Sequence, residues 1–185
     1  MPEFINNNTV GLLSCRLIKK KLIGYLNVVG GFSENTVICS TAKLCDPLSI
    51  TIEDYVFVGR HAALGSRLTI REGAWIGDHA RINAAVQGLL RRSVALPDCA
   101  AGGHTEIGSY AYVGKRSRVR PGVCIGNGAA IAPRSDVVTD VPAYAVVRGR
   151  PARVVGHLED LWTGKLDASF LGDDWRRREV GHDPR

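Results

Sequence analysis

Histidine, arginine and lysine are the side chains of this 185-residue chain best suited to do chemistry. Five histidines are present, and 24 lysines and arginines stand against 18 aspartates and glutamates, for a formal net charge of +6. Histidine exchanges protons near neutral pH. A positive surface favours polyanionic partners, whether a phosphorylated cofactor or a nucleic acid. The aromatic residues are few and do not alternate with the basic ones, which disfavours nucleic-acid binding.

The cysteines indicate neither a metal site nor a disulfide framework, because their number is odd and no two are spaced as CxxC. We therefore expect reduced thiols in a cytoplasmic protein. The sequence contains no apolar run of about 18 residues, so no transmembrane helix is expected. The N-terminus lacks an apolar segment with a small-residue cleavage site, so no secretory signal is expected.

The elements that must position the charged side chains follow from a period of six residues. Apolar residues recur at every sixth position, and a small or aliphatic residue follows each of them by four. Neither a helix nor a long alternating strand has this period. A short strand with a turn does, and three such units close a coil of 18 residues, so the sequence predicts a parallel β-helix. The leading positions are Ile52, Val58, Leu64, Ile70, Ile76 and Ile82, then Ile107, Val113, Val119, Ile125, Ile131 and Val137.

Glycine accounts for 21 of the 185 residues, above the usual share of about 7%. Many glycines directly follow a leading position, among them Gly59, Gly77 and Gly114. We expect tight turns there, because glycine adopts backbone conformations that other residues avoid. A narrow interior filled by isoleucine, valine and alanine explains why only 6% of the residues are aromatic.

One corner of the predicted coil is basic. Residues one coil apart stack on the same corner, and an elongated ridge of positive charge suits an extended polyanion such as coenzyme A, which carries a pyrophosphate and a 3′-phosphate at one end. The turns on this corner are Arg60-His61, Asp78-His79, Lys115-Arg116 and Pro133-Arg134.

Two stretches, Val119–Gly126 and Ser135–Gly156, resemble the hexapeptide-repeat acyltransferases. The second stretch is similar to the motif that ends the repeat domain of that family, with Thr139 where the family carries a lysine. The similarity covers residues 38–156 and is densest to the sugar and polysaccharide O-acetyltransferases. It implies an all-β fold, a left-handed parallel β-helix. It also implies a homotrimer with active sites between subunits, acetyl-CoA as co-substrate and no metal.

The resemblance also suggests which residues bind coenzyme A. In the family, amides of the pantetheine arm meet backbone groups at turns that align with Lys115 and the Ala132-Pro133-Arg134 turn, and cations near the terminal motif meet the phosphates. Arginine suits phosphate because its guanidinium presents a fixed fork of donors. The expected cofactor-binding residues are Lys115, Ala132, Pro133, Arg134, Arg148, Arg150 and Arg153.

The repeat is interrupted at residues 88–106, an inserted loop that in this family shapes the active site. Acyl transfer to a hydroxyl needs a general base, usually a histidine. Sugar acetyltransferases carry it where this loop begins, at Gln87 here, and the acceptor-binding asparagine of several relatives falls at Gly59. Two other histidines are candidates. His104 stands at the return of the loop, where serine acetyltransferases carry a histidine, and His79 lies on the basic corner.

We expect three segments along the chain. Residues 1–37 form a cap, with a basic amphipathic helix over 9–29 that covers the first coil rather than lying on a membrane. Residues 38–156 form the β-helix. Residues 157–185 form a tail that frays after residue 173. The tail begins with a short docking helix whose apolar residues are Leu158, Leu161 and Trp162.

The favoured function is an acetyl-CoA-dependent acyltransferase that acetylates a sugar hydroxyl by direct transfer, with a histidine as general base. The alternative is a catalytically degenerate repeat protein that serves as an oligomeric scaffold or binding module, which Gln87 and Gly59 suggest. A metal-dependent lyase like the γ-class carbonic anhydrases is disfavoured, because the chain has no HxxxxH spacing.

Overall fold

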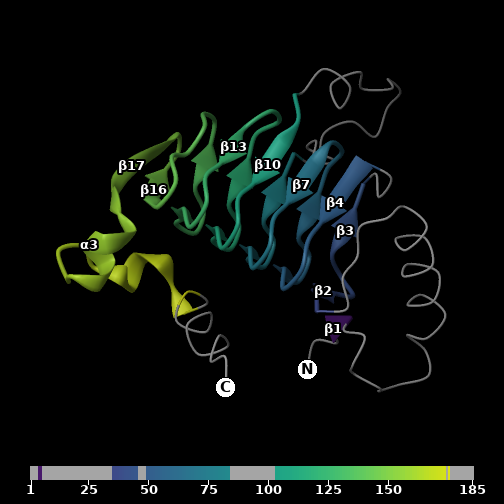
Figure 1. The fold of residues 1–185 in the computed structure, drawn as a ribbon, viewed down its shortest axis with the longest axis horizontal. Coiled ribbons are helices and arrows are strands. Elements are labelled where there is room, and N and C mark those ends of the chain that lie inside the picture. Colours follow the sequence, from purple (N-terminus) through teal and green to yellow (C-terminus); the bar gives the residue numbers. More distant parts are fainter. Residues whose placement is uncertain (1–3, 6–34, 46–48, 84–102, 174, 176–185) are drawn as a thin grey trace.

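The computed structural model shows a β-solenoid, the β-helix that the six-residue period predicts. The structure describes residues 4–5, 35–45, 49–83, 103–173 and 175. The coils stack along the long axis of the molecule, and β17 and α3 lie at the end opposite β1 and β2 (Figure 1). Within the described ranges, no helix is long and apolar enough to cross a membrane.

Successive strands of the solenoid fall into three sheets, here named A, B and C. Neighbouring strands are parallel except at the two ends of sheet A, where β1–β2 and β16–β17 are antiparallel. Sheet A contains β1 (Phe4–Ile5), β2 (Val37–Cys39), β5 (Phe57–Val58), β8 (Trp75–Ile76), β11 (Tyr112–Val113), β14 (Ala130–Ile131), β16 (Ala145–Gly149) and β17 (Ala152–His157). Sheet B contains β3 (Lys43–Leu44), β6 (Ala63–Leu64), β9 (Arg81–Ile82), β12 (Arg118–Val119) and β15 (Asp136–Val137). Sheet C contains β4 (Ile50–Ile52), β7 (Leu68–Ile70), β10 (Thr105–Ile107) and β13 (Cys124–Ile125).

The leading residues of the repeat fill the interior of the solenoid, as predicted. Val58, Ile76 and Val113 have no exposed surface, and the small residues between the leading positions are equally buried. The two serines among these small residues, Ser117 and Ser135, are 1% exposed. Ser117 Oγ donates a hydrogen bond of 2.9 Å to the Ala132 carbonyl, so this buried hydroxyl is satisfied.

The glycines that follow leading positions are needed for a reason other than the expected tight turn. Gly114 does not adopt a positive φ, and the left-handed residue of its turn is Arg116, with φ of 59°. A Cβ on Gly114 would lie 2.5 Å from Pro133 N and 2.6 Å from Ile131 O in the next coil. The close approach of the next coil therefore excludes a side chain. A Cβ on Gly59 would lie 2.8 Å from Asp78 N, and one on Gly77 would lie 2.7 Å from Lys115 N.

The insertion interrupts the chain but not the stack of coils. In sheet C, Leu68 lies opposite Ile50, an offset of 18 residues, whereas Thr105 lies opposite Leu68, an offset of 37. The difference between 37 and 18 places 19 residues outside the coil. The coil resumes at Thr105, as predicted. The predicted start of the loop at Gly88 and the predicted helix over 9–29 lie outside the described residues.

The C-terminal tail packs on the outer face of sheet A. Its two helical elements are α3 (Leu158–Trp162) and the 3-10 helix η2 (Ala168–Leu171). The predicted docking helix is present, but only part of its apolar surface docks. Leu158 is buried, whereas Trp162 is 69% exposed.

Leu171 and Trp175 complete the docking of the tail. Both cover Tyr112, which has no exposed surface. The rings of Trp175 and Tyr112 meet edge to face with centroids 5.1 Å apart, and the Tyr112 hydroxyl donates to the Leu171 carbonyl at 3.2 Å. The expectation that the tail frays after residue 173 is therefore wrong for Trp175.

Candidate functional site

The predicted basic corner exists, at the junction of sheets A and B. Its turns are held in line by backbone hydrogen bonds between successive coils. His79 N donates to Arg60 O at 2.7 Å, and Arg134 N donates to Lys115 O at 2.9 Å. Each turn places one residue at positive φ, so the side chains of these residues repeat along the corner. They are His61, His79, Arg116 and Arg134.

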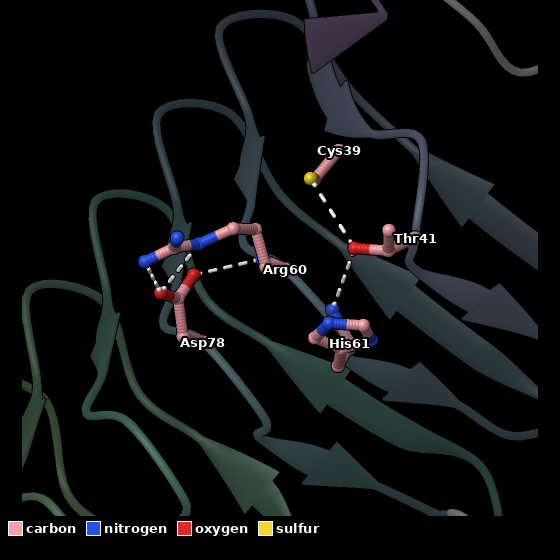
Figure 2. A network of polar contacts seen from close by, with 5 residues as sticks. All are labelled: Cys39, Thr41, Arg60, His61 and Asp78. Atoms are coloured by element: carbon pink, nitrogen blue, oxygen red, sulfur yellow. Dashed lines mark hydrogen bonds and ion pairs between the residues drawn. The ribbon is translucent and has the colours of Figure 1, made fainter. Parts of the chain in front are cut away.

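At the N-terminal end of this corner the basic charge is neutralised. Asp78 accepts three hydrogen bonds from Arg60, one from the backbone N–H at 2.7 Å and two from the guanidinium at 3.0 and 2.7 Å (Figure 2). Partial burial raises the pKa of the Asp78 carboxyl, but the hydrogen bonds and charge of Arg60 outweigh it and hold that pKa below its ordinary value. Arg60 is therefore engaged by Asp78 and contributes little to a polyanion site.

The two histidines of the corner stack on one another. The rings of His61 and His79 lie 5.0 Å apart, with 25° between their planes. The backbone N–H of His61 is fixed by a 3.1 Å hydrogen bond to Thr41 Oγ1 (Figure 2). His79 itself is exposed and so can meet a ligand in solvent.

Beside His79 a groove of about 300 Å³ runs over the corner and onto the outer face of sheet B. We call it the basic groove. Its charged lining residues come from three successive coils and from the turn between β16 and β17, and its wall includes the buried serines of the corner. The lining residues are His79, Arg81, Arg116, Ser117, Arg118, Ser135, Asp136 and Arg150.

Three of the predicted cofactor residues gather at the C-terminal end of this corner. Arg134 stacks on Lys115 through the backbone bond already given, and Arg150 Nε donates to the Arg134 carbonyl at 2.6 Å. All three side chains have accessible surface. The structure thus brings together Lys115, Arg134 and Arg150.

The predicted turn at Ala132 and Pro133 is less open. Ala132 is 1% exposed, its N–H donates to Val147 O at 2.9 Å, and its carbonyl accepts from Ser117. The tail also approaches this turn, because a methyl group on Gly172 would lie 3.7 Å from Pro133 Cγ. A ligand can reach Pro133 but not the Ala132 side chain.

The remaining two predicted arginines lie on the terminal hairpin. Arg148 and Arg153 are directly opposite each other in the β16–β17 pair. The Arg148 guanidinium lies 5.3 Å from the centre of the Phe170 ring, a cation–π contact with the tail. These two arginines therefore flank the tail, apart from the residues that line the basic groove.

His104 lies on a different corner from His79. It precedes β10 at the junction of sheets B and C, where Gly103 touches Gly122 of the next coil. His79 precedes the strand β9 of sheet B at the junction with sheet A. The two candidate bases thus stand on the two corners that bound sheet B, at opposite ends of its strands, and the structure does not bring them together. The position that aligns with the usual histidine, Gln87, lies outside the described residues.

Sequence reasoning missed the outward-facing residues of sheet B. Arg81, Arg118 and Asp136 each precede a buried leading residue and form one row across β9, β12 and β15. They line the basic groove together with the turn residues. The signal was available, because each stands one position before a leading residue of the repeat.

A second hollow, of about 480 Å³, lies on sheet C near Glu106, Cys124 and Asp140. It contains no predicted site residue. In the part of the chain that the structure describes, no three or more histidine, cysteine or acidic side chains are grouped to hold a metal ion.

Comparison with known proteins gives sequence relatives. A chloramphenicol acetyltransferase from Klebsiella aerogenes is 43% identical over 63 residues, which are 34% of this chain and 30% of that protein's length. The putative colanic acid biosynthesis acetyltransferase WcaF from Escherichia coli K12 is 26% identical over 130 residues, 66% of each chain. The matched part thus spans less than a third of the chloramphenicol acetyltransferase.

Among solved structures, an S84A mutant of the N-acyltransferase AntD from Bacillus cereus is similar at 19% identity with a TM-score of 0.46, over 77% of this chain and 96% of that one. A likeness at that level carries no weight for function. No protein-family profile matches the chain. The six-residue repeat, the parallel solenoid that it builds and the sequence relatives agree, and the chain is a hexapeptide-repeat β-solenoid that is similar to acetyltransferases of the hexapeptide-repeat family.

Proposed function

We propose that this protein transfers an acetyl group, or another short acyl group, from coenzyme A to a hydroxyl of a sugar or saccharide. The observation that carries the proposal is the basic corner, which gathers Lys115, Arg134 and Arg150 at its C-terminal end and has the exposed His79 on the same line of turns. The sequence relatives, which are acetyltransferases, support it. The protein acts in the cytoplasm as a homotrimer, with active sites between subunits and no metal.

The cofactor lies along the corner between sheets A and B. Its phosphates bind at the C-terminal end, where Lys115, Arg134 and Arg150 are stacked, and Arg148 and Arg153 on the hairpin add positive charge. The single hydrogen of the Ala132 N–H is already engaged by Val147, whereas a carbonyl oxygen can accept a second hydrogen bond, so the pantetheine N–H groups donate to carbonyl oxygens of this turn. Pro133 forms the wall of the cofactor site.

The reaction is a direct transfer with no acyl-enzyme intermediate. The acceptor oxygen attacks the thioester carbon as a histidine takes the hydroxyl proton, the C–S bond breaks, and the thiolate leaves and regains a proton. His79 is the base if one subunit supplies the groove. His104, at the other edge of sheet B, is the base if a neighbouring subunit presents that corner.

Binding of coenzyme A tests the proposal. We expect calorimetric titration of the full chain with coenzyme A to show saturable binding that weakens at high salt, because the contacts are ionic. The Arg134→Gln and Arg150→Gln variants should bind less tightly, and Arg67→Gln, on another corner, should bind as the native chain does. Absence of binding at millimolar coenzyme A would overturn the proposal and favour the oligomeric scaffold. That alternative is suggested by Gln87 and Gly59, which stand where relatives carry the catalytic histidine and the acceptor-binding asparagine.

A further inference from the structure

Arg81 and Arg118 form a pair of positive charges on the outer face of sheet B. They are directly opposite each other on the neighbouring strands β9 and β12. Adjacent strands are about 4.8 Å apart, so both side chains leave the sheet from neighbouring points on one face. Each alternates with a buried residue, Ile82 or Val119, and both line the basic groove.

Within the described residues, neither Arg81 nor Arg118 forms an ion pair with a carboxylate. The ion pairs of the described chain engage Arg60, Arg71 and Arg120. Asp136 lies opposite Arg118 in the same row and attracts its charge, but the Asp136 carboxylate accepts its hydrogen bonds, of 3.1 and 3.0 Å, from Arg120, so one carboxylate faces three arginines. Like charges directly opposite each other on a sheet are destabilising. The row therefore keeps a local excess of positive charge that an anion would offset.

We propose that Arg81 and Arg118 bind an oxyanion, a phosphate or a carboxylate, that the acceptor carries. Two guanidinium groups present forks of N–H donors that match either group. The pair lines the same groove as His79, whereas Lys115 and Arg134, where the proposed function places the phosphates of the cofactor, are not among the lining residues of that groove. The assignment to the acceptor rests on that function, whereas the oxyanion site itself rests on sheet B alone.

The acceptor is accordingly an acidic saccharide, such as a sugar phosphate or a uronic acid. A neutral sugar would leave the two arginines without a counter-charge in the groove. An oxyanion held by Arg81 and Arg118 would also fix the sugar next to His79, because both line the same groove.

Direct titration shows whether the arginine pair binds the anionic group, the neutral part of the sugar or the cofactor. Glucose 1-phosphate, glucuronate, glucose and coenzyme A are each titrated into the full chain at low ionic strength. We expect the two acidic sugars to bind and glucose not to. The Arg81→Gln and Arg118→Gln variants should weaken the acidic sugars about tenfold, since a hydrogen bond to a charged group contributes about 1.5 kcal/mol. Coenzyme A should bind these variants as tightly as the native chain.

Lys43→Gln is the matched control. Lys43 stands in the same outward row of sheet B, two coils before Arg81, and is outside the groove. The Lys43→Gln variant loses the same charge as the two arginine variants, and its affinities for the two acidic sugars, glucose and coenzyme A should equal those of the native chain. Arg118→Lys, which keeps the charge and loses the fork, should recover part of the affinity for the acidic sugars.

Two results would overturn the inference. If the acidic sugars bind no better than glucose, the arginine pair is not an oxyanion site. If the two glutamine variants weaken coenzyme A as much as the acidic sugars, the pair belongs to the cofactor. If coenzyme A fails to bind the native chain while acidic sugars bind through Arg118, the acyl transfer is wrong and the oxyanion site stands.

Discussion

At the scale of single residues, the position of carboxylates decides which arginines can bind a ligand. Arg60 and Arg120 each form an ion pair, with Asp78 and Asp136, whereas Arg116 and Arg118 form none within the described ranges. In the sequence, all four lie within the region of six-residue repeats. Only the stacking of coils shows which charge is already neutralised and which faces an open groove.

The choice of base is tested by replacing each histidine with asparagine. His79 has a φ of 58°, a conformation that asparagine tolerates better than alanine, so His79→Asn keeps the turn intact. The histidine that removes the proton should lose about 10²–10⁴-fold in the rate of acetyl transfer on replacement. His157→Asn, in the tail, serves as a control. Full activity in both the His79 and the His104 variants would remove the histidine mechanism.

The ion pair of Asp136 predicts a pH dependence of stability. Hydrogen bonds from Arg120, and to a smaller extent the charges of Arg120, Arg118 and Arg150, hold the pKa of Asp136 below its ordinary value of 3.8. Because the folded-state pKa is the lower one, the pair stabilises the fold above pH 3.8 and this contribution disappears as the pH falls through the folded-state pKa.

We therefore expect Asp136→Asn to lower the free energy of unfolding at pH 7 by less than about 1 kcal/mol, as for exposed ion pairs. In urea denaturation series, the difference between native and variant chains should close as the medium is made more acidic. An equal difference at every pH would contradict this account.

At the scale of strands and turns, the distance between coils governs what each position tolerates. On the corner between sheets C and A, tyrosines lie over glycines of the preceding coil. A Cβ on Gly73 would meet the ring of Tyr110 at 2.5 Å, and one on Gly128 would meet Tyr144 at 2.7 Å. On the corner between sheets A and B the neighbour is backbone, which cannot move aside as a side chain can.

Gly114→Ala should accordingly be costly. Its Cβ would meet backbone atoms of Pro133 and Ile131, and overpacking of this kind costs about 1–3 kcal/mol. Gly164→Ala is the control, because Gly164 has a positive φ but open space around it. Its loss of about 1 kcal/mol reports backbone strain alone. Thermal unfolding that ranks Gly164→Ala as the more damaging change would count against the close-approach explanation.

The tail offers a matched pair of tryptophans. Trp175 is buried against Tyr112, and Trp162 is exposed. Trp175→Ala should cost about 3–5 kcal/mol, whereas Trp162→Ala should stay within about 0.5 kcal/mol. Urea unfolding followed by circular dichroism measures both. Equal losses would mean that the tail is not held by its buried ring.

At the scale of the whole molecule, the period of the sequence was sufficient for the solenoid, its interior and its basic corner. Leading residues such as Ile76 are buried because two apolar positions in every six can face inward. The docking of Trp175 was not predictable in this way. Its partner Tyr112 lies on the outer face of sheet A, and that face becomes an apolar surface only when strands from distant parts of the sequence are stacked.

The candidate site was predicted only where it follows the turns. The corner and its stack of Lys115 and Arg134 follow from the spacing of 18. The groove continues over strand residues such as Arg118, which lie on the outer face of sheet B. The spacing of the turns carries no information about these residues. His104 and His79 each stand where they were predicted to, and their separation on two corners follows from the strands that they precede, β10 of sheet C and β9 of sheet B.

The offset of 37 residues between Leu68 and Thr105 has a consequence for how such a protein can change. The corner after β6 has three residues, 65–67, and removal of residues 84–102 would leave three after β9, namely Asn83, Gly103 and His104. We expect this deletion to fold with an unbroken stack and to keep coenzyme A binding while acetylation of the acceptor falls; loss of the fold would contradict it. The segment at this corner can then change in length and sequence, while the coils that the repeat encodes stay stacked.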